Sequence, residues 1–521
     1  MFYFNSNHFI SFISNQRYTL TDEKREKLEE RDLISRSSIN GYSQGTIAHV
    51  RHTGLGAIHN FVASALALPT GIITAGFLTR QLGPTEYGVF TVTVAIIVWI
   101  EAAVSLGFSR AAVKLVAETE DWRSSIPRVL QIQVLVSLAA SLLVVAVAPA
   151  LSVLLDAPQL KSTLRFFSVD IPIFSITQIL LAIMMGRGSY KLSAVMRAVY
   201  WLSRAGLIFL LVTLIPNVSG ALLAILGSSV IIMACSVAFV RPPVSGSSHF
   251  SFQRIWGYVW PLFLYTVGMD LFAILDLLLV KALIEAPQAA GFYGAAKNLA
   301  ITPVFFAASL SPILIAKLTE LHKQSHDELV HSMSRQAIRL VMCLLPFAGM
   351  TAGAAPEVVT SIYGGTFLPS APTLAILIFG TLGVAMISVG VSILIAAGYF
   401  KWLVAIVLPF LLSAFAGNIF LVPSLGMIGA AWVTTSVACI GACLVLWVVG
   451  KLCNIVLPLA TFLRSIIVCG IAYLLASLWP ALGFLVVIEL LLIGISIVIL
   501  FILIGELNRN DLTFFRSLFV W

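Results

Sequence analysis

The chain has 521 residues, of which 59% are hydrophobic and 10% are charged, and its mean hydropathy is +1.01. That composition excludes a water-soluble protein of ordinary surface polarity. The net charge of +8 comes from basic residues spread over many loops without interleaved aromatic side chains, which excludes a nucleic-acid-binding stripe. We therefore predict an all-α, polytopic membrane protein, because open sheets cannot satisfy their backbone in lipid.

The first 53 residues precede any long apolar stretch and are expected to form a cytoplasmic tail. The start of the chain has no basic segment ahead of its short apolar run and no small-residue cleavage site, so we predict no secretory signal peptide. Residues 21–33, TDEKREKLEERDL, suggest a short charged helix within this tail. A solvated tail is the favoured interpretation, and a surface-lying anchor is the alternative.

Fourteen apolar stretches follow, each long enough to cross a hydrocarbon core about 30 Å thick. We predict spans at residues 55–79, 87–107, 128–154, 163–185, 190–215, 218–240, 256–284, 289–316, 333–362, 369–396, 398–422, 425–449, 456–478 and 481–505. Pro, Ser and Gly dominate the segment after the sixth span, which predicts a linker. The expected organisation is therefore a cytoplasmic tail (1–53), an N-terminal six-helix bundle (54–240), a cytoplasmic linker (241–255), a C-terminal six-helix bundle (256–450), and two extra helices with a cytoplasmic tail (451–521).

The basic residues are distributed unequally between the two sides of these spans. Of the 31 Lys and Arg residues, four lie on the side opposite the N-terminal tail (Arg80, Lys161, Arg165 and Lys281) and two lie inside spans (Arg204 and Lys297). The other 25 share the side of the tail. Because short loops rich in Lys and Arg stay cytoplasmic, we expect both termini in the cytoplasm.

Short patterns recur in the two halves of the chain at offsets of about 203 to 210 residues, which is typical of transporters built by duplication. The pairs are Tyr87-Gly88-Val89-Phe90 with Ala290-Gly291-Phe292-Tyr293, Gly188-Ser189-Tyr190-Lys191 with Gly398-Tyr399-Phe400-Lys401, and Ser219-Gly220-Ala221 with Ile428-Gly429-Ala430. Six spans separate equivalent positions, so both halves enter the membrane from the same side. We therefore expect a pseudo-two-fold axis along the membrane normal.

Ionisable side chains inside the predicted spans form a short list of site candidates. Each costs about 2.5 to 3.5 kcal/mol near the bilayer centre on insertion scales, so each is expected to face protein or a water-filled cavity. The candidates for a substrate cavity are Arg204, Lys297, Asp276, Asp170, Glu101 and Asp270. Glu489 lies in a span outside the repeat and is assigned to a helix interface.

Asp276 and Lys297 are predicted to lie on neighbouring helices, each about 12 Å from the non-cytoplasmic surface at 1.5 Å per residue. Two interpretations stay open: the two residues neutralise each other to hold the hairpin together, or Lys297 lines a cavity and faces the substrate. Arg204 has the same two interpretations, with Asp170 as its conceivable partner. Cationic groups in a dry cavity would bind an anion, because they hold phosphate oxygens strongly where water is excluded.

A resemblance to a known family rests on several motifs taken together. Leu82-Gly83-Pro84-Thr85-Glu86-Tyr87-Gly88-Val89-Phe90, followed by Ser105-Leu106-Gly107, resembles the polysaccharide transporter or O-antigen flippase family of the multidrug, oligosaccharidyl-lipid and polysaccharide exporter superfamily. The second half is similar to that family through Asp276-Leu277-Leu278-Leu279, Gly291-Phe292-Tyr293-Gly294-Ala295-Ala296-Lys297 and Ser311-Pro312. The likeness covers residues 54–450.

The resemblance implies a flippase that moves an oligosaccharide on a polyprenyl pyrophosphate carrier across the bacterial cytoplasmic (inner) membrane, by alternating access of two bundles. It implies the lipid-linked substrate and membrane lipid as partners, with a polysaccharide polymerase and glycosyltransferases as further partners and no nucleic acid. One departure is that the first span carries no carboxylate, so the acidic first-helix site of drug-exporting relatives is missing.

Two alternatives stay open beside the flippase. The first is a drug or small-metabolite exporter of the same superfamily, and the second is a membrane glycan polymerase or acyltransferase. An enzyme needs carboxylates, histidines or arginines gathered at one reacting centre, whereas the predicted outer loops are short and nearly free of such groups. There is no Walker A sequence, and the six cysteines lack zinc-like spacing. We therefore expect a transporter without enzymatic activity, catalytic residues, cofactor or metal.

Overall fold

The computed structural model describes residues 66–118, 122–243, 252–481, 483 and 485–506. The predicted N-terminal tail, the start of the first predicted span and most of the linker lie outside these residues. The N-terminal half consists of α3 (Ala67–Glu118), α4 (Trp122–Leu154), α5 (Pro158–Phe167), α6 (Asp170–Gly186), α7 (Tyr190–Leu214) and α8 (Val218–Val240).

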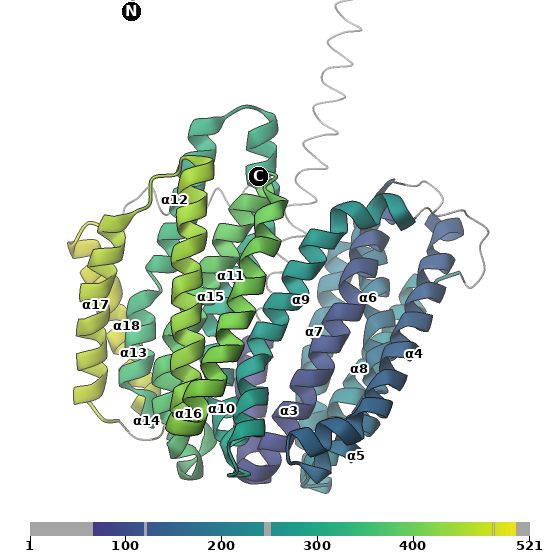
Figure 1. The fold of residues 1–521 in the computed structure, drawn as a ribbon, viewed down its shortest axis with the longest axis horizontal. Helices are drawn as coiled ribbons and strands as arrows, with labels where there is room; N and C mark the ends of the chain where they lie inside the picture. The colour runs from purple at the N-terminus through teal and green to yellow at the C-terminus, as the bar shows by residue number, and fades with distance from the viewer. Residues whose placement is uncertain (1–65, 119–121, 244–251, 482, 484, 507–521) are drawn as a thin grey trace, which may run out of the picture.

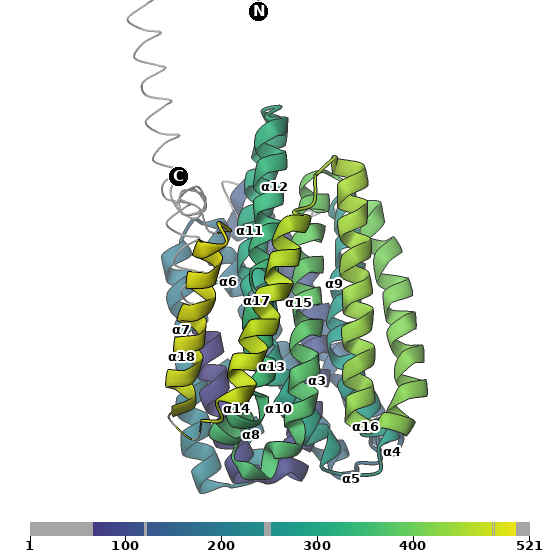
Figure 2. The same ribbon diagram turned by 90° about the vertical axis from the view of Figure 1, so that its left-hand side faces the viewer.

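The C-terminal half contains more helices because several of its membrane passes are interrupted. Its helices are α9 (Phe252–Leu283), α10 (Ala289–Ala300), α11 (Thr302–Lys323), α12 (Asp327–Met342), α13 (Leu345–Gly353), α14 (Ala355–Tyr363), the 3-10 helix η1 (Gly365–Ser370), α15 (Ala371–Ala396) and α16 (Phe400–Cys453). Two more, α17 (Leu459–Leu478) and α18 (Leu485–Leu503), complete the described chain and lie along the outer edge of this half (Figure 2).

The described residues contain twelve helical stretches that are long and apolar enough to cross a membrane. Two of these, α3 and α16, each make two passes, because the backbone leaves the helical conformation at Gly83 (φ 69°) and at Gly426 (φ 61°). Glycine adopts a positive φ at little cost, which permits so tight a reversal. Counting both passes of α3 and of α16 gives fourteen, so the predicted all-α, polytopic fold is confirmed.

Span eight was predicted as one helix, but the structure breaks it into α10 and α11 at Ile301. Pro303 follows the break, and its missing N–H leaves the carbonyl of Leu299 without its helical partner. The hydroxyl of Thr302 donates to that carbonyl at 3.2 Å, and Thr381 of α15 donates to the carbonyl of Ala300 at 2.6 Å. A break in lipid is tolerated where neighbouring groups satisfy the backbone in this way.

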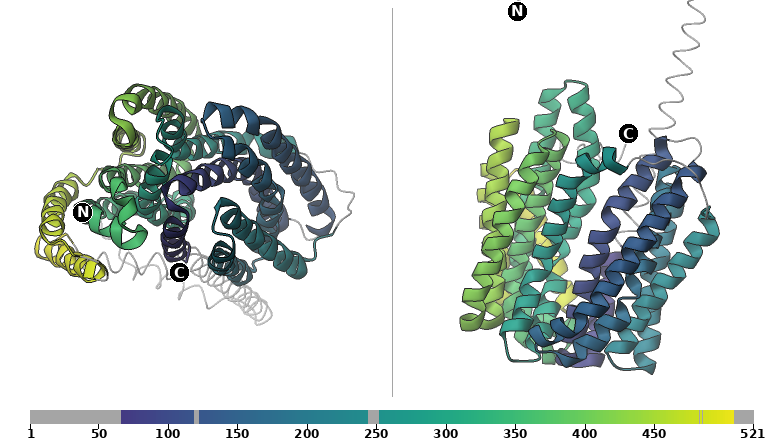
Figure 3. Two further views of the ribbon diagram at one scale, coloured as in Figure 1. Left: turned by 90° about the horizontal axis from the view of Figure 1, so that it is seen from below. Right: turned by 45° about the vertical axis from the view of Figure 1, so that its right-hand side comes forward.

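The two halves meet along α3, α9 and α10, and α3 lies between them when the molecule is viewed from below (Figures 1 and 3). At this seam Gly88 of α3 faces Gly291 of α10. A Cβ atom added to Gly88 would lie 2.9 Å from the backbone nitrogen of Gly291, and one added to Gly291 would overlap the carbonyl oxygen of Pro84. Small residues allow such close helix packing in membranes. The two glycines occupy equivalent places in the recurring patterns, so equivalent positions contact each other.

The end of the molecule at which α3 reverses between its two passes, at the bottom of Figure 1, is called the lower end below. Here Arg80 of α3 crosses to α14, where it donates to the carbonyl oxygens of Ser361 at 2.6 Å and of Ile362 at 3.2 Å. The ring of Phe367 lies beside Tyr87, with 5.9 Å between centroids. Polar and aromatic contacts therefore join the halves at the lower end.

A buried ionic cluster attaches α17 and α18 to the rest of the C-terminal half. Glu506, just beyond α18, accepts hydrogen bonds from Arg339 of α12 (2.7 Å), Arg464 of α17 (2.7 Å) and Thr461 of α17 (2.5 Å). Burial raises the pKa of Glu506, but the hydrogen bonds from Thr461, Arg464 and Arg339 outweigh it and hold the pKa below its ordinary value. The carboxylate form of Glu506 therefore stabilises the attachment.

Candidate substrate-binding site

A cavity of about 350 Å³ lies at the seam between the two halves. Its walls come from α3, α7, α9, α10 and α11, and both passes of α3 contribute, with Thr74 from the first and Thr91 from the second. Most of the lining is apolar, which is usual for ligand sites that place a few polar groups among hydrophobic ones. Trp99, further along α3, donates to the carbonyl of Val267 at 3.2 Å and adds a further contact between the halves.

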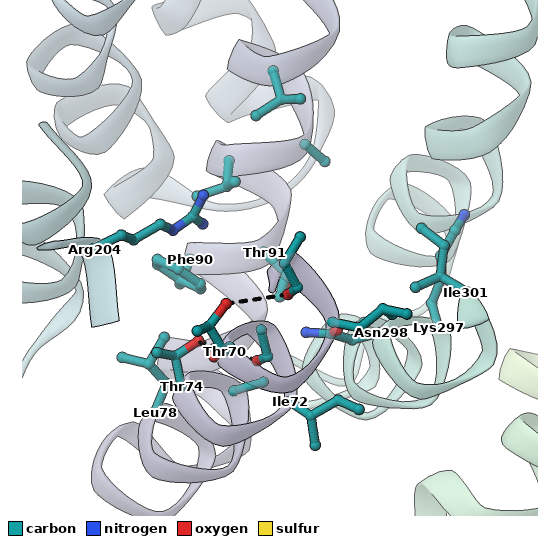
Figure 4. Close-up of a pocket in the computed structure, with 18 of the residues that line it drawn as sticks. Thr70, Ile72, Thr74, Leu78, Phe90, Thr91, Arg204, Lys297, Asn298 and Ile301 are labelled. Atoms are coloured by element: carbon teal, nitrogen blue, oxygen red, sulfur yellow. Dashed lines mark hydrogen bonds between the residues drawn. The ribbon is translucent and has the colours of Figure 1, made fainter. Parts of the chain in front are cut away.

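Two cations line this cavity, one from each half. Figure 4 shows Arg204 of α7 and Lys297 of α10 on opposite sides of the cavity. Of the described residues in the lining, only these two are charged. The sequence predicted that they converge from opposite halves, and the structure places both on the wall of one cavity. That they bind a ligand stays a prediction.

Lys297 is anchored by a buried carboxylate. Its ammonium group pairs with Asp276 of α9, as predicted, and the side chain of Asp276 is 1% exposed. Asp276 also accepts hydrogen bonds from the Tyr293 hydroxyl (2.7 Å), the Thr434 hydroxyl (3.1 Å) and the backbone nitrogen of Leu277 (2.7 Å). Both interpretations of Lys297 are therefore compatible, since a lysine that is 21% exposed is paired on one side and faces the cavity on the other.

Helix ends add to the stability of Lys297 at this depth. The break at Ile301 places Lys297 in the last turn of α10, where the carbonyl ends of a helix favour a cation. The counterpart in the other half is Asp170, which the sequence placed inside an unbroken fourth span. Asp170 does lie inside the fourth span (Pro158–Gly186), but that span is divided into α5 and α6, and Asp170 is the first residue of α6. A carboxylate at a helix N-terminus is favoured by the same dipole.

Arg204 is held much less firmly than Lys297. Its guanidinium donates to the Tyr200 hydroxyl at 3.4 Å and lies 5.5 Å from the ring centroid of Trp201. Its conceivable partner Asp170 makes no direct ion pair with it among the described residues, although Asp170 and Glu101 both lie close enough to interact electrostatically with it. The cation in the N-terminal half therefore lacks the direct carboxylate partner that Lys297 has.

Glu101 of α3 and Asp170 form a buried carboxyl pair behind Arg204. Each is 2% exposed, and their side chains lie within hydrogen-bonding reach of each other. One oxygen of each, Oε1 of Glu101 and Oδ1 of Asp170, has no hydrogen-bond donor in the described part of the chain. Neither residue lines the cavity.

The remaining sequence candidates lie away from the cavity. Asp270 sits on α9 ahead of Asp276, is partly exposed and does not belong to the cavity lining. Glu489 of α18 is buried, and neither of its carboxylate oxygens has a donor among the described residues. It was assigned to a helix interface, and its burial on α18 agrees with that assignment.

Sequence reasoning missed the uncharged polar residues of the site. Thr70, Thr74, Thr91 and Asn298 line the cavity between the two cations (Figure 4). Threonines are common in membrane helices, so no single one stands out. The available signal was the spacing of Thr70 and Thr74, which places both on one helix face, together with an asparagine directly after the intramembrane lysine.

Two helical halves around a cavity at their seam define a multi-pass membrane transporter. A family model described as "Polysaccharide biosynthesis protein" matches residues 77–372, which is more than half of the chain. The chain therefore belongs to this polysaccharide biosynthesis family, which confirms the predicted family resemblance. No curated protein sequence matches the chain.

Solved structures share the fold over most of the chain. A structure described as lipid II flippase MurJ in an inward closed conformation is similar with a TM-score of 0.70 and 18% identity, covering 88% of this chain and 99% of that one. An inward-facing multidrug resistance MATE family transporter is similar with a TM-score of 0.62 and 12% identity, covering 80% of this chain and 98% of that one. A Vibrio cholerae MATE transporter is similar with a TM-score of 0.57 and 13% identity, covering 77% of this chain and 96% of that one. At these identities the likeness concerns the fold.

Proposed function

We propose that the protein is a flippase that translocates polyprenyl-pyrophosphate-linked oligosaccharide across the bacterial cytoplasmic membrane for surface polysaccharide export. The observation that carries the proposal is the pair of cations, Arg204 and Lys297, on the wall of one cavity between the two halves. Guanidinium and ammonium groups bind phosphate oxygens most strongly where water is scarce, and a pyrophosphate supplies several such oxygens. Family membership supplies the glycan context.

Alternating access of the two bundles, residues 54–240 and 256–450, would move the headgroup. The few basic residues outside the cytoplasmic loops include Arg80 of the lower end and Lys161 and Arg165 of α5, which supports assigning the lower end to the outer leaflet and both termini to the cytoplasm. Release to the outer leaflet would then require the Gly88–Gly291 packing and the Arg80 hydrogen bonds to separate.

The charged residues take different roles in this proposal. Arg204 and Lys297 contact the pyrophosphate, Asp276 positions Lys297, and Glu101 with Asp170 lies near Arg204 without a direct ion pair to it. We assign no substrate contact to Asp270. Glycosyltransferases would supply the lipid-linked substrate on the cytoplasmic side, and a polymerase would consume it on the outer side. The chain would act as a transporter and not as an enzyme.

Export of a drug or small metabolite is the second candidate, because multidrug transporters share the fold. Two cations in the cavity disfavour a cationic drug through direct repulsion. An anionic metabolite remains compatible with the same two residues. The two functions differ in whether a lipid-linked glycan accumulates in cells when the cavity is altered.

A cellular experiment tests the proposal. In cells that depend on this protein for glycan export, the Arg204→Ala, Lys297→Ala double variant should remain inserted and abundant while lipid-linked glycan accumulates on the cytoplasmic leaflet. The matched control is Arg165→Ala, Lys401→Ala, which removes one cation from each half at exposed positions outside the cavity. Normal export by the cavity variant would contradict the proposal.

A further inference from the structure

We infer that the cavity carries a saccharide subsite, a hydrogen-bond-accepting wall made by Thr70 and Thr74 of the first pass of α3, Thr91 of its second pass and Asn298 of α10, around the open surface of Gly71. This inference rests on the proposed flippase function and specifies how the sugar part of the headgroup is recognised. All five residues line the cavity that Arg204 and Lys297 enter. Figure 4 shows Thr70, Thr74, Thr91 and Asn298 between the two cations.

The threonine hydroxyls of the first pass present only acceptor capacity to the cavity. Thr70 donates its proton to the carbonyl of Leu66 at 2.5 Å, and Thr74 donates to the carbonyl of Thr70 at 2.7 Å. A hydroxyl has one proton and two lone pairs, so a hydroxyl that donates to its own helix can only accept from a ligand. Both oxygens therefore select groups that donate hydrogen bonds.

The same polarity extends to the second pass and to α10. Thr91 donates to the carbonyl of Tyr87 at 3.0 Å, which again leaves only its lone pairs for a ligand. The amide nitrogen of Asn298 donates to the Tyr87 hydroxyl at 3.5 Å, which leaves its Oδ1 as an acceptor and one N–H as a donor. The wall therefore combines four acceptor oxygens from three helical segments.

Gly71 leaves room for a ring against this wall. A Cβ atom added to Gly71 would meet no heavy atom within 4 Å, although the residue lines the cavity. Thr70, Gly71 and Thr74 share one side of the helix because of their spacing along it. The backbone between the two threonines is therefore exposed to the cavity, and a flat ligand can approach it closely.

The combined polarity identifies the ligand class. Sugar hydroxyls and acetamido N–H groups are donors that match an accepting wall, while a pyrophosphate matches the two cations on either side of it. A glycosyl pyrophosphate carries both kinds of group in one headgroup, because the pyrophosphate is attached at C1 of the sugar and the donor groups begin at C2. Both can therefore lie within a single cavity. A lipid phosphate without sugar would use the cations and leave the wall unused.

Binding of two probes to the full-length protein tests this inference. The probes are farnesyl pyrophosphate and farnesyl-pyrophosphate-linked N-acetylglucosamine. In the Thr70→Val, Thr74→Val variant, affinity for the sugar-bearing probe should fall about tenfold, because two acceptors are removed with little change of shape. Affinity for the sugar-free probe should change less than about twofold. The control is Thr213→Val on α7, which also bonds its own helix, at 2.6 Å to Phe209, but lies outside the cavity.

A second variant fills the space without removing any polar group. Gly71→Leu should weaken binding of the sugar-bearing probe about tenfold or more while the sugar-free probe still binds. Gly206→Leu is the matched control, since a Cβ at Gly206 also meets nothing within 4 Å and Gly206 is not part of the lining. Melting temperatures of all variants would establish that each is folded.

The outcomes separate the subsite from the function. Equal loss of both probes, or unchanged binding of the sugar-bearing probe, in the two wall variants would overturn the saccharide subsite. Wild-type protein that binds neither probe would instead contradict the proposed flippase function. Loss of the sugar-bearing probe alone in both wall variants, with both controls unchanged, would establish the subsite.

Discussion

The two cations of the cavity are backed by carboxylates in different ways. Behind Lys297, the carboxylate of Asp276 is surrounded by four donors from α9, α10 and α16. Behind Arg204, Glu101 and Asp170 lie together with one oxygen of each lacking a donor among the described residues. Fully satisfied buried networks rigidify their surroundings and fix a unique arrangement. The comparison indicates that more direct contacts hold Lys297 in place than hold Arg204.

The strongest test of this contrast is Asp276→Asn. It leaves Lys297 without its buried countercharge, and removal of one partner from a buried pair typically costs about 3–5 kcal/mol. We expect that loss of unfolding free energy, measured by denaturation of the purified protein in detergent. The Asp276→Asn, Lys297→Gln double variant should recover at least about 1 kcal/mol. Strictly additive losses in this cycle would show that the two residues are not coupled.

A second test addresses the seam on which both cations depend. Gly291→Ala places a methyl group into the carbonyl of Pro84, and overpacking of this kind costs about 1–3 kcal/mol. We expect a lower melting temperature and faster hydrogen exchange at the reversal of α3 near Gly83 and at the start of α10. Gly470→Ala on α17 is the control, because its Cβ would meet nothing within 4 Å. Equal melting temperatures for the two variants would mean that the glycine contact is not tight.

Neutral substitution of Glu101 or Asp170 in the N-terminal half should lower the unfolding free energy less than neutral substitution of Asp276 in the C-terminal half. Glu101→Gln or Asp170→Asn alone should cost less than about 1 kcal/mol, because the amide keeps a polar group within hydrogen-bonding reach of the partner carboxyl and the other oxygen already lacks a donor among the described residues. The same denaturation measurement used for Asp276→Asn checks this. If either variant lost as much unfolding free energy as Asp276→Asn, the carboxylates behind Arg204 and behind Lys297 would not differ in the way we propose.

Glu506 offers a test of a satisfied carboxylate that lies outside the membrane spans. Its folded pKa is lower than its ordinary value of 4.5, so its stabilising contribution is present above about pH 4.5 and is lost as the pH falls through the folded pKa. We expect hydrogen exchange in α17 and α18 to accelerate as the pH is lowered below about 4.5, after correction for intrinsic rates. Glu506→Gln should remove this dependence, and an unchanged pH dependence in the variant would assign it to another group.

Much of the fold was predictable because each pass is long and apolar. The fourteen passes, the Asp276–Lys297 pair and the position of Arg204 and Lys297 in opposite halves follow from hydropathy and helix length. The breaks at Ile301 and ahead of Asp170 were not predicted. The break at Ile301 depends on a tertiary partner, Thr381, whose hydroxyl donates a hydrogen bond to the freed carbonyl of Ala300. Hydropathy cannot show such partners.

The site was predictable only in its charged part. An intramembrane charge is rare enough to be noticed, whereas the threonines of the wall resemble threonines elsewhere in the chain. The orientation of Thr70 and Thr74 depends on how the first pass of α3 faces α7 and α10, which a single sequence does not contain. Asp270 was a candidate for the cavity because its charge lies within a span, but it does not belong to the cavity lining. A charge within a span therefore does not imply that it faces the cavity.

The most direct measurement of the central claim is the rate at which a labelled polyprenyl-pyrophosphate glycan reaches the opposite leaflet of proteoliposomes. Charge-assisted hydrogen bonds contribute about 1.5–3 kcal/mol each, so loss of Arg204 and Lys297 should slow translocation by about tenfold or more. The Arg165→Ala, Lys401→Ala control should translocate at the wild-type rate. Equal rates for wild-type protein and the Arg204→Ala, Lys297→Ala variant at matched protein density would contradict the account.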